Sequence, residues 1–329
     1  MAEADTPNEP ILFTARLNNV RPLVNLLRTI SFRPRTLCAI NQSGMMFSVE
    51  DSQCVVAQAY LRPTLFAAFS YNFAAAPNNA NAAIAGDSNG NDNDEMETDD
   101  VASEITQVSL PLDNLIECLT LFYGPSGSTS HSNQPGPMVS NLSANNPLDL
   151  RGATTVQIGY KGEGNDFEMM LEERGTISVC RLATFVPEQP VDLEFSRHPV
   201  IQQLTIRSEW LRDAFNELDP TSESVTIGIA STAPYFRIAT VGENGSTEMT
   251  YSQENQILDA FFCSEEQENR YKLPLILKCR QALALSDKTK IKVNQRGFLT
   301  LQFMIPTDVD VSFVDFVFAP LVHADETIS

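Results

Sequence analysis

Two short stretches, Ser109-Leu110-Pro111-Leu112 and Lys272-Leu273-Pro274-Leu275, decide how this chain is organised. Each is followed by a run in which apolar residues recur with helical spacing, at 113–119 in the first case and at 276–283 in the second. Each also lies downstream of a pattern typical of a strand that leads into a helix. The same order of elements thus occurs twice, which indicates an internal duplication.

The two copies become similar in length once two polar tracts in the first copy are set aside. The interval from the first helix to the Leu-Pro-Leu stretch is 91 positions in the first copy and 63 in the second. A tract rich in Ala, Asn and Asp at 74–103 accounts for this difference. A second tract, rich in Gly, Ser, Asn and Pro, lengthens the first copy again at 124–152. Neither tract has hydrophobic periodicity, so we predict that both are disordered inserts.

The repeat predicts two tandem domains. We place the first domain at 10–184, a proline-containing connector at 185–200, the second domain at 201–320 and a tail at 321–329. Each domain is expected to hold two helices among eight or nine short, mostly antiparallel strands. Strands and helices do not alternate as in a βαβ fold, so the predicted fold class is α+β.

Charge is unevenly distributed along the chain. The 329 residues carry a formal net charge of −20 at pH 7, which argues against nucleic-acid binding if that charge is spread evenly. Seven carboxylates lie within 87–100, however, inside the first predicted insert. We expect the acidic run Asp92–Asp100 within this stretch to be a solvated loop rather than a metal cluster or a partner-binding tail. The folded part is therefore less acidic than the total charge indicates.

The composition also disfavours several classes of protein. No stretch reaches the roughly 20 apolar residues that span a bilayer, and the first residues lack a signal-peptide pattern, so we expect an intracellular protein. Six cysteines without a Cys-x-x-Cys pair, together with three histidines, supply no zinc-ligand spacing. We therefore expect neither a metal site nor a cofactor.

Five segments carry a resemblance to a known family, at 17–23, 211–219, 234–238, 269–272 and 294–305. The last, Asn-Gln-Arg-Gly-Phe-Leu-Thr-Leu-Gln-Phe-Met-Ile, is the most specific. In these segments and in its order of elements, the chain resembles the Rad-one subunits of the heterotrimeric DNA-damage checkpoint clamp, a family related to the sliding clamp PCNA. The resemblance covers nearly everything except the two inserts and the termini. It implies the sliding-clamp (PCNA-like) fold in both domains.

The resemblance implies a ring of three related chains around duplex DNA, with helices lining the hole and only phosphates facing the protein. It then gives a DNA-facing role to polar residues that share helix faces, namely Arg21, Asn25, Arg28, Arg212, Asn216, Lys278 and Gln281. The same residues also suit ordinary solvated helix faces, and periodicity alone does not separate the two interpretations. The helix at 112–122 offers Asn114 and Glu117 instead, so we expect a weakly basic lining.

Neighbouring subunits of such a ring join through unpaired strand edges. The resemblance implies that these edges are Thr176, Ile177, Ser178, Val179, Cys180, Arg181 and Leu182 in the first domain, and Tyr235, Phe236, Arg237, Ile238, Ala239, Thr240 and Val241 in the second. Clamps also receive client proteins in an apolar pocket beneath the connector. Met45, Phe47 and Leu193 are the candidate lining residues, with core packing as the ordinary alternative for each.

The implied function is that of a non-catalytic subunit that tethers checkpoint and repair factors to DNA. The implied partners are two paralogous clamp subunits of the Rad-nine and Hus-one types, an ATP-dependent checkpoint clamp loader, and double-stranded DNA; the implied location is the nucleus. A homotrimeric replication-type clamp and a 3′–5′ DNA exonuclease remain alternatives. For the exonuclease, the candidate metal ligands are the carboxylates Asp166, Glu168, Glu172 and Glu173, although such spacing is common at solvated strand edges.

Overall fold

The structure is a computed structural model, and it describes residues 11–72, 105–122, 153–188, 191–193, 195–243, 245–252 and 257–321. Both predicted inserts, the acidic run at 87–100 and all but the first residue of the predicted tail lie outside the described residues. No helix in the described ranges is long and apolar enough to cross a membrane.

Among its described residues, the first half of the chain contains two α-helices and nine strands. In chain order these are β1 (Phe13–Leu17), α1 (Arg21–Thr29), β2 (Arg35–Asn41), β3 (Gly44–Asp51), β4 (Val55–Leu61), β5 (Ala68–Tyr71), β6 (Thr106–Pro111), α2 (Leu112–Leu119), β7 (Thr155–Tyr160), β8 (Phe167–Glu173) and β9 (Thr176–Leu182). Short 3₁₀ turns at Pro63–Leu65 and, in the connector, at Phe195–Arg197 complete this half.

The second half repeats the order, with its last helix broken into two. Its elements are β10 (Val200–Arg207), α3 (Ser208–Glu217), β11 (Ser224–Ile229), β12 (Phe236–Gly242), β13 (Gly245–Tyr251), β14 (Leu258–Cys263), β15 (Gln267–Lys272), α4 (Leu273–Ile276), a 3₁₀ turn (Leu277–Cys279), α5 (Arg280–Leu285), β16 (Lys288–Asn294), β17 (Leu299–Pro306) and β18 (Val311–Phe318). Both Leu-Pro-Leu stretches stand at a strand-to-helix junction, as their sequence repeat predicts.

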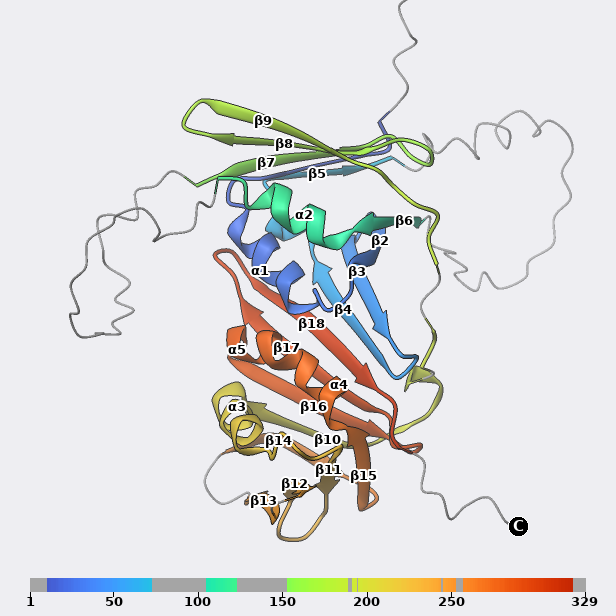
Figure 1. The fold of residues 1–329 in the computed structure, drawn as a ribbon, viewed down its shortest axis with the longest axis vertical. Coiled ribbons are helices and arrows are strands. Elements are labelled where there is room, and N and C mark those ends of the chain that lie inside the picture. Colours follow the sequence, from blue (N-terminus) through green and yellow to red (C-terminus); the bar gives the residue numbers. More distant parts are fainter. Residues whose placement is uncertain are drawn as a thin grey trace, which may run out of the picture.

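The strands form three antiparallel sheets (Figure 1). A nine-stranded sheet with the order β14-β10-β16-β17-β18-β4-β3-β2-β6 runs through both halves of the chain. A five-stranded sheet, β5-β1-β7-β8-β9, closes one end, and a four-stranded sheet, β13-β12-β11-β15, closes the other. The two halves join where β18 pairs with β4, from Phe313 opposite Tyr60 to Phe318 opposite Val55. We call this junction the β4–β18 seam.

The helices pack on one face of the nine-stranded sheet (Figure 1). In α1 the residues Leu23, Val24, Leu26 and Leu27 are buried, because their helical spacing turns one apolar stripe toward the sheets. At the start of α1, the side-chain oxygen of Asn19 accepts a hydrogen bond from the Arg21 amide at 3.0 Å and so fixes the turn that leads into the helix. One hydrophobic core extends through both halves of the molecule.

The sheet order corrects one expectation from the sequence. The segment 235–241 was expected to be a free edge, but its strand, β12, is paired on both sides, with β11 and with β13. The edge strands of the four-stranded sheet are β13, at Gly245–Tyr251, and β15. The first expected edge, Thr176–Leu182, does form β9 and does lie at the edge of its sheet.

Candidate nucleic-acid interface and subunit edges

The helix faces turned away from the sheets carry most of the predicted DNA-facing residues. Arg21, Asn25 and Arg28 are exposed on α1, on the side opposite its buried stripe. On α3 the exposed residues Arg212 and Asn216 lie between the buried positions Leu211, Ala214 and Phe215. Gln281 is exposed at the start of α5. These side chains therefore share the helical side of the molecule.

Lys278 does not fit the prediction of a free DNA-facing cation. Its ammonium lies 2.7 Å from a carboxylate oxygen of Asp51, which ends β3 in the other half of the chain. Only 22% of the Lys278 side chain and 15% of the Asp51 side chain are exposed. The ammonium also lies 4.8 Å from the centre of the Phe32 ring. Lys278 thus links the two halves across the β4–β18 seam, because a partly buried ammonium needs a nearby carboxylate.

The Lys278 pair also changes the acidity of its partner. The hydrogen bond from Lys278 is the main reason why the pKa of the Asp51 carboxyl lies below its ordinary value, and the nearby Arg33 guanidinium lowers it further. Arg280, the next cation along, donates from its guanidinium to the backbone oxygen of Phe215 at 2.9 Å and so ties α5 to α3. The helical side carries no clear excess of positive charge, since the exposed carboxylates Asp113, Glu117, Asp213 and Glu217 equal in number the exposed arginines on its helices.

The free edge strand β9 exposes apolar side chains. Ile177 and Val179 are 60% and 52% exposed, although both are β-branched residues typical of paired strands. On the next strand, β8, Met170 is opposite Val179 and is also exposed. Arg181, on the same face, pairs with Glu168 at 2.9 Å. The edge therefore combines an unpaired backbone with an apolar outer face.

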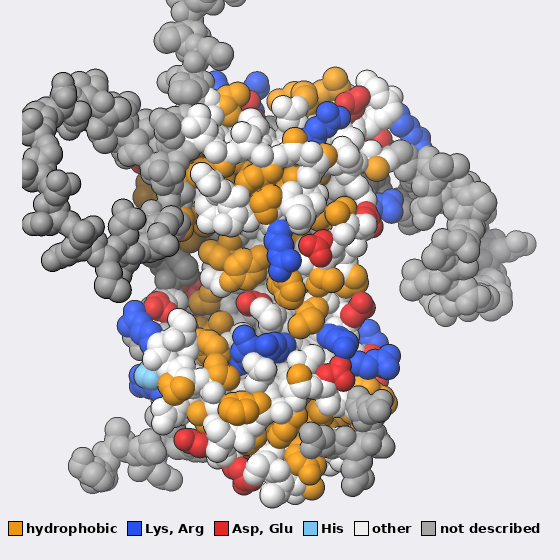
Figure 2. Space-filling view, turned by 180° about the vertical axis from the view of Figure 1, so that it is seen from behind, with side chains coloured by type: hydrophobic (Ala, Val, Ile, Leu, Met, Phe, Trp, Pro, Cys, Tyr) orange, Lys and Arg blue, Asp and Glu red, His pale blue; other side chains and the backbone are white. Residues whose placement is uncertain are grey.

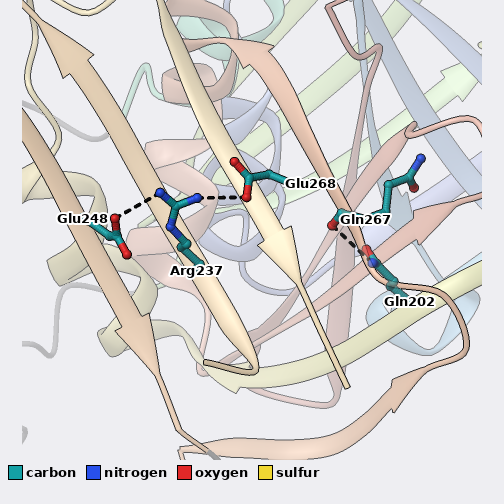
Figure 3. A network of polar contacts seen from close by, with 5 residues as sticks. All are labelled: Gln202, Arg237, Glu248, Gln267 and Glu268. Atoms are coloured by element: carbon teal, nitrogen blue, oxygen red, sulfur yellow. Dashed lines mark hydrogen bonds and ion pairs between the residues drawn. The ribbon is translucent and has the colours of Figure 1, made fainter. Parts of the chain in front are cut away.

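The second free edge, β13, is tied to its sheet by an arginine. Figure 3 shows Arg237 of β12 between Glu248 of β13 and Glu268 of β15, with its two terminal nitrogens 3.0 and 2.8 Å from the carboxylates. The guanidinium reaches Glu268 across β11, where Gly228 has no side chain to intervene. Arg237 therefore holds three strands of this sheet together and is not an outward contact residue of an edge.

A cavity of about 530 Å³ opens on the face of the nine-stranded sheet opposite the helices. Its walls come from β2, β3, β4, β17 and β18, on both sides of the seam, and include Ala39, Met46, Tyr60, Ile105, Gln302, Phe313 and Asp315. We call it the outer pocket. Burial raises the pKa of Asp315, whose second carboxylate oxygen is buried without a hydrogen-bond partner among the described residues.

None of the three predicted pocket residues presents its side chain to the outer pocket. Met45 borders the outer pocket, but its side chain belongs to the core, as does that of Phe47. The residue that presents its side chain to the pocket is Met46, one position between them, because successive side chains of a strand point to opposite faces. Leu193 is buried in the connector and does not line this pocket.

The chain matches the family model described as Repair protein Rad1/Rec1/Rad17 over residues 12–305. This chain belongs to that family. The human Cell cycle checkpoint protein RAD1 is 32% identical over 307 residues, which cover 93% of this chain and 90% of the human protein. The DNA damage checkpoint control protein rad1 of Schizosaccharomyces pombe is 27% identical over 313 residues, with 94% and 87% of the two chains covered. The DNA repair exonuclease REC1 of Mycosarcoma maydis is 21% identical over 404 residues, with 89% and 87% covered.

Membership in the Rad1 family places the chain among DNA-damage checkpoint and repair proteins, and the sheet-rich α+β structure with few helices agrees with a PCNA-like clamp. The predicted fold class and family are therefore confirmed.

The carboxylates considered for a nuclease occupy ordinary positions in this Rad1-family chain. Glu168 is paired with Arg181, and Glu173 accepts a hydrogen bond from Thr154 at 2.7 Å. Asp166 and Glu172 are exposed on or beside β8. Within the described ranges, no three His, Cys, Asp or Glu side chains converge as metal ligands would.

Proposed function

We propose that this chain is one non-catalytic subunit of a heterotrimeric, ring-shaped DNA-damage checkpoint clamp. The observation that carries the proposal is the β4–β18 seam, considered with the edge strands β9 and β13. In the repeated order of elements, β9 stands in the first half where β18 stands in the second, and β13 stands in the second half where β4 stands in the first. If β9 pairs with the strand of a neighbouring subunit that is equivalent to β13, the contact between the two chains repeats the strand pairing of the β4–β18 seam. Repetition of that contact by three chains closes a ring.

DNA occupies the hole of this ring, against the helical side. The contacts proposed for this chain are Arg21, Asn25, Arg28, Arg212, Asn216 and Gln281, all of which are exposed on helices. They meet phosphates only, so binding is independent of base sequence. With Lys278 engaged by Asp51, the lining contributes few cations to DNA binding, and topological enclosure rather than affinity holds the clamp on DNA.

The lack of a strongly basic lining supports the proposed heteromeric state. Three copies of this lining give a weakly attractive hole, whereas partners of the Rad-nine and Hus-one types supply the missing charge. An ATP-dependent loader opens the ring, clients dock at the outer pocket, and the complex acts in the nucleus. The proposed role is to tether checkpoint and repair factors near damaged DNA.

Native mass measurement tests the proposed assembly. The chain is purified alone and after co-expression with the two paralogous subunits, and each sample is analysed by native mass spectrometry. We expect a monomer alone and a 1:1:1 complex with both partners. A homotrimer of the chain alone contradicts the proposal and favours a replication-type clamp.

Edge variants test the contact itself. Ile177→Asp with Val179→Asp places charges on the β9 edge, and the expected result is a folded chain that no longer joins one neighbour. Met170→Asp is the control, because Met170 is also apolar and exposed but lies one strand inside the edge. Assembly that survives the double change, or fails equally in the control, contradicts the use of β9.

Charge reversal tests the DNA-facing helices. We consider the triple variant Arg21→Glu, Arg28→Glu and Arg212→Glu. It should be retained on closed circular DNA for a shorter time, and the salt dependence of loading should decrease by the equivalent of about three phosphate contacts. Trimer assembly should persist. Lys290→Glu with Lys292→Glu is the control, because these lysines lie on the opposite face of the sheet. Unchanged retention of the triple variant contradicts the assigned lining.

A further inference from the structure

Helix α3 has one covered flank and one open flank. On the covered flank it packs against α5, where the Ser286 hydroxyl donates a hydrogen bond to the Ser208 hydroxyl at 2.7 Å. The opposite flank lies beside β13, where the Tyr251 hydroxyl donates to the backbone oxygen of Trp210 at 3.2 Å. The Trp210 side chain is 40% exposed, and Glu217, two turns farther along the same side of the helix, is exposed as well. We call the surface formed by Trp210 and Glu217 the open α3 flank.

The corresponding flank of α1 is buried at the β4–β18 seam. The Val20 amide donates to the backbone oxygen just before β7 at 3.1 Å, and the Ser208 amide donates to the one just before β16 at 2.9 Å, so Val20 and Ser208 are counterparts. With this match, Thr29 of α1 is the counterpart of Glu217. Thr29 is only 2% exposed, and α1 contacts α5 across the seam. The seam therefore joins helix to helix as well as strand to strand.

The side of α2 that adjoins β9 is the matching surface at the other edge of the chain. Cys118 marks this side, because burial and the neighbouring Cys180 thiol of β9 raise the pKa of Cys118 to about 11. Asn114 and Leu121 lie one turn before and after Cys118, and Glu117 is one turn from both. Glu117 is exposed, and Leu121 is 54% exposed. A contact that repeats the seam places this side of α2 against the open α3 flank of the next subunit, as α5 lies against α1.

Two copies of this chain bring acidic surfaces together at such a contact. Residues 112–119 include Asp113 and Glu117 but no Lys or Arg. A second copy therefore places its Glu117 near Glu217, and like charges at a partly desolvated contact repel each other. The opposite face of the molecule has a different character, since Figure 2 shows Lys and Arg side chains gathered there among scattered Asp and Glu.

We propose that the open α3 flank selects the neighbour in the ring. It binds a helix that presents an apolar side chain to Trp210 and a Lys or Arg to Glu217, and it excludes a second copy of this chain. The face of a Trp ring attracts cations as well as apolar groups, and Trp is enriched among the residues that contribute most to protein interfaces. The inference rests on the proposed function, because it takes the neighbour to be a paralogous clamp subunit that joins β13.

Charge exchange in the full chain, without partners, tests the exclusion. Glu217→Lys and Glu117→Lys are made separately and together, and self-association is measured by sedimentation velocity up to the solubility limit. Each single change places opposite charges at the contact between copies. It should strengthen self-association at least about fivefold, so that oligomers appear at concentrations where the parent is a monomer. The double change restores like charges and should return the chain to the behaviour of the parent.

Glu188→Lys with Glu265→Lys is the matched control for net charge. Both residues are exposed and lie outside the helices and the strands, and the pair changes the net charge as much as the double change does. This control should remain a monomer.

Fluorine NMR tests the contact in the complex. Trp210 is the only tryptophan of the chain, so labelling with fluorotryptophan gives one signal. The signal should shift in the complex with the paralogue that joins β13 and stay unchanged with the paralogue that joins β9. Trp210→Ala should weaken the first complex at least about tenfold and leave the second unchanged, and the intact second complex shows that the variant is folded.

An unchanged Trp210 signal in the 1:1:1 complex overturns the inference. Single charge changes that leave the chain a monomer overturn it as well, as does a control that self-associates as strongly as they do. The native mass measurement answers the proposed function separately, because a 1:1:1 complex can form without a contact at Trp210. A parent chain that is already a homotrimer contradicts both.

Discussion

Strands β18 and β9 occupy equivalent places in the repeated order of elements, but β18 is paired on both sides, whereas β9 is paired on one side only. On β18 the residues Val314, Phe316 and Phe318 are buried, and every backbone position from 313 to 318 faces a partner on β4. On β9 the β-branched residues Ile177 and Val179 stay exposed, and only β8 pairs with the strand. Unpaired edges with apolar faces invite another chain. In the proposed assembly, this chain completes one strand junction internally and leaves β9 and β13 to form the equivalent junctions with its neighbours.

The largest effect is expected from breaking the packing behind the seam. The Phe316 ring lies 5.8 to 6.1 Å from the rings of Phe303, Phe318 and Phe32, and none of its surface is exposed. Phe316→Ala leaves a cavity in the shared core, so the free energy of unfolding should fall by about 3–5 kcal/mol. Urea denaturation followed by circular dichroism measures this change.

Val179→Ala is the matched change on the open edge. Since half of that side chain is exposed in the free chain, the free energy of unfolding should change by less than about 0.5 kcal/mol. A comparable loss in both variants means that the free chain already buries its β9 edge, and the contrast between seam and edge is then wrong.

The second effect concerns the ion pair that crosses the seam. Lys278→Met keeps the length of the side chain but removes the closer cationic partner of Asp51 and leaves Arg33 at 3.6 Å, so it should lower the free energy of unfolding by about 1–2 kcal/mol at pH 7. The folded pKa of Asp51 is below its ordinary value of about 3.9, so the pair contributes fully above that value. Its contribution is lost as the pH falls through the lowered folded pKa. The stabilities of the two proteins, measured by urea denaturation across pH 2–7, should therefore converge in acid.

Lys288→Met provides the control, because Lys288 makes a pair of the same length with Asp259 but both side chains are about half exposed. Solvent screens such a pair, and the stability at pH 7 should hardly change. A pH-independent loss in Lys278→Met indicates that its packing on Phe32, rather than its charge, holds the halves together.

The repeat and the strand content were predictable from the sequence because they are local properties. Alternation of apolar residues and the two Leu-Pro-Leu stretches lie within short windows, and most of the predicted helix-face residues are exposed as expected. The identity of an edge is not local. Strands β12 and β13 both alternate, and only the pairing with β11 decides which of them is outermost.

Lys278 and Met46 show two further limits. Helical periodicity placed Lys278 on a solvent-directed face, but the residue that neutralises it, Asp51, is far away in the sequence and comes from the other half. On β3 the sequence did contain a signal. The alternate positions Met45, Phe47 and Val49 are more apolar than the positions between them, so they face the core. Met46 belongs to the other set of positions and therefore lies on the outer face.

The third effect concerns Asp315, which lies on β18 on the face of the seam that points away from the helices. Asp315→Asn removes a buried charge with an unpartnered oxygen, so the variant should be more stable than the parent by about 1 kcal/mol at pH 7. Burial raises the folded pKa of Asp315 above its ordinary value. The parent therefore loses stability as the pH rises from that ordinary value through the raised folded pKa. Thermal unfolding at several pH values should show the gain at neutral pH and its disappearance near pH 3.

Asp310→Asn is the control for this gain, since Asp310 is exposed in the preceding turn and lies 3.6 Å from Arg62. It should leave the midpoint unchanged. A more stable parent at pH 7 contradicts the assignment of a desolvated Asp315, and indicates that the charge of Lys292 outweighs the cost of burial.

The smallest effect is expected from the ion pair on the open edge. Arg181 and Glu168 are 61% and 50% exposed, so their attraction is screened by water, although the pairing still raises the pKa of Arg181. Arg181→Ala should leave the thermal midpoint of the free chain unchanged, whereas Arg237→Ala, which removes the link between β12 and two other strands, should lower it. If Arg181→Ala nevertheless weakens the heterotrimer, the charge on β9 acts between chains. A lowered midpoint in the free chain instead means that this edge is stabilised from within, as the seam is, and needs no neighbour.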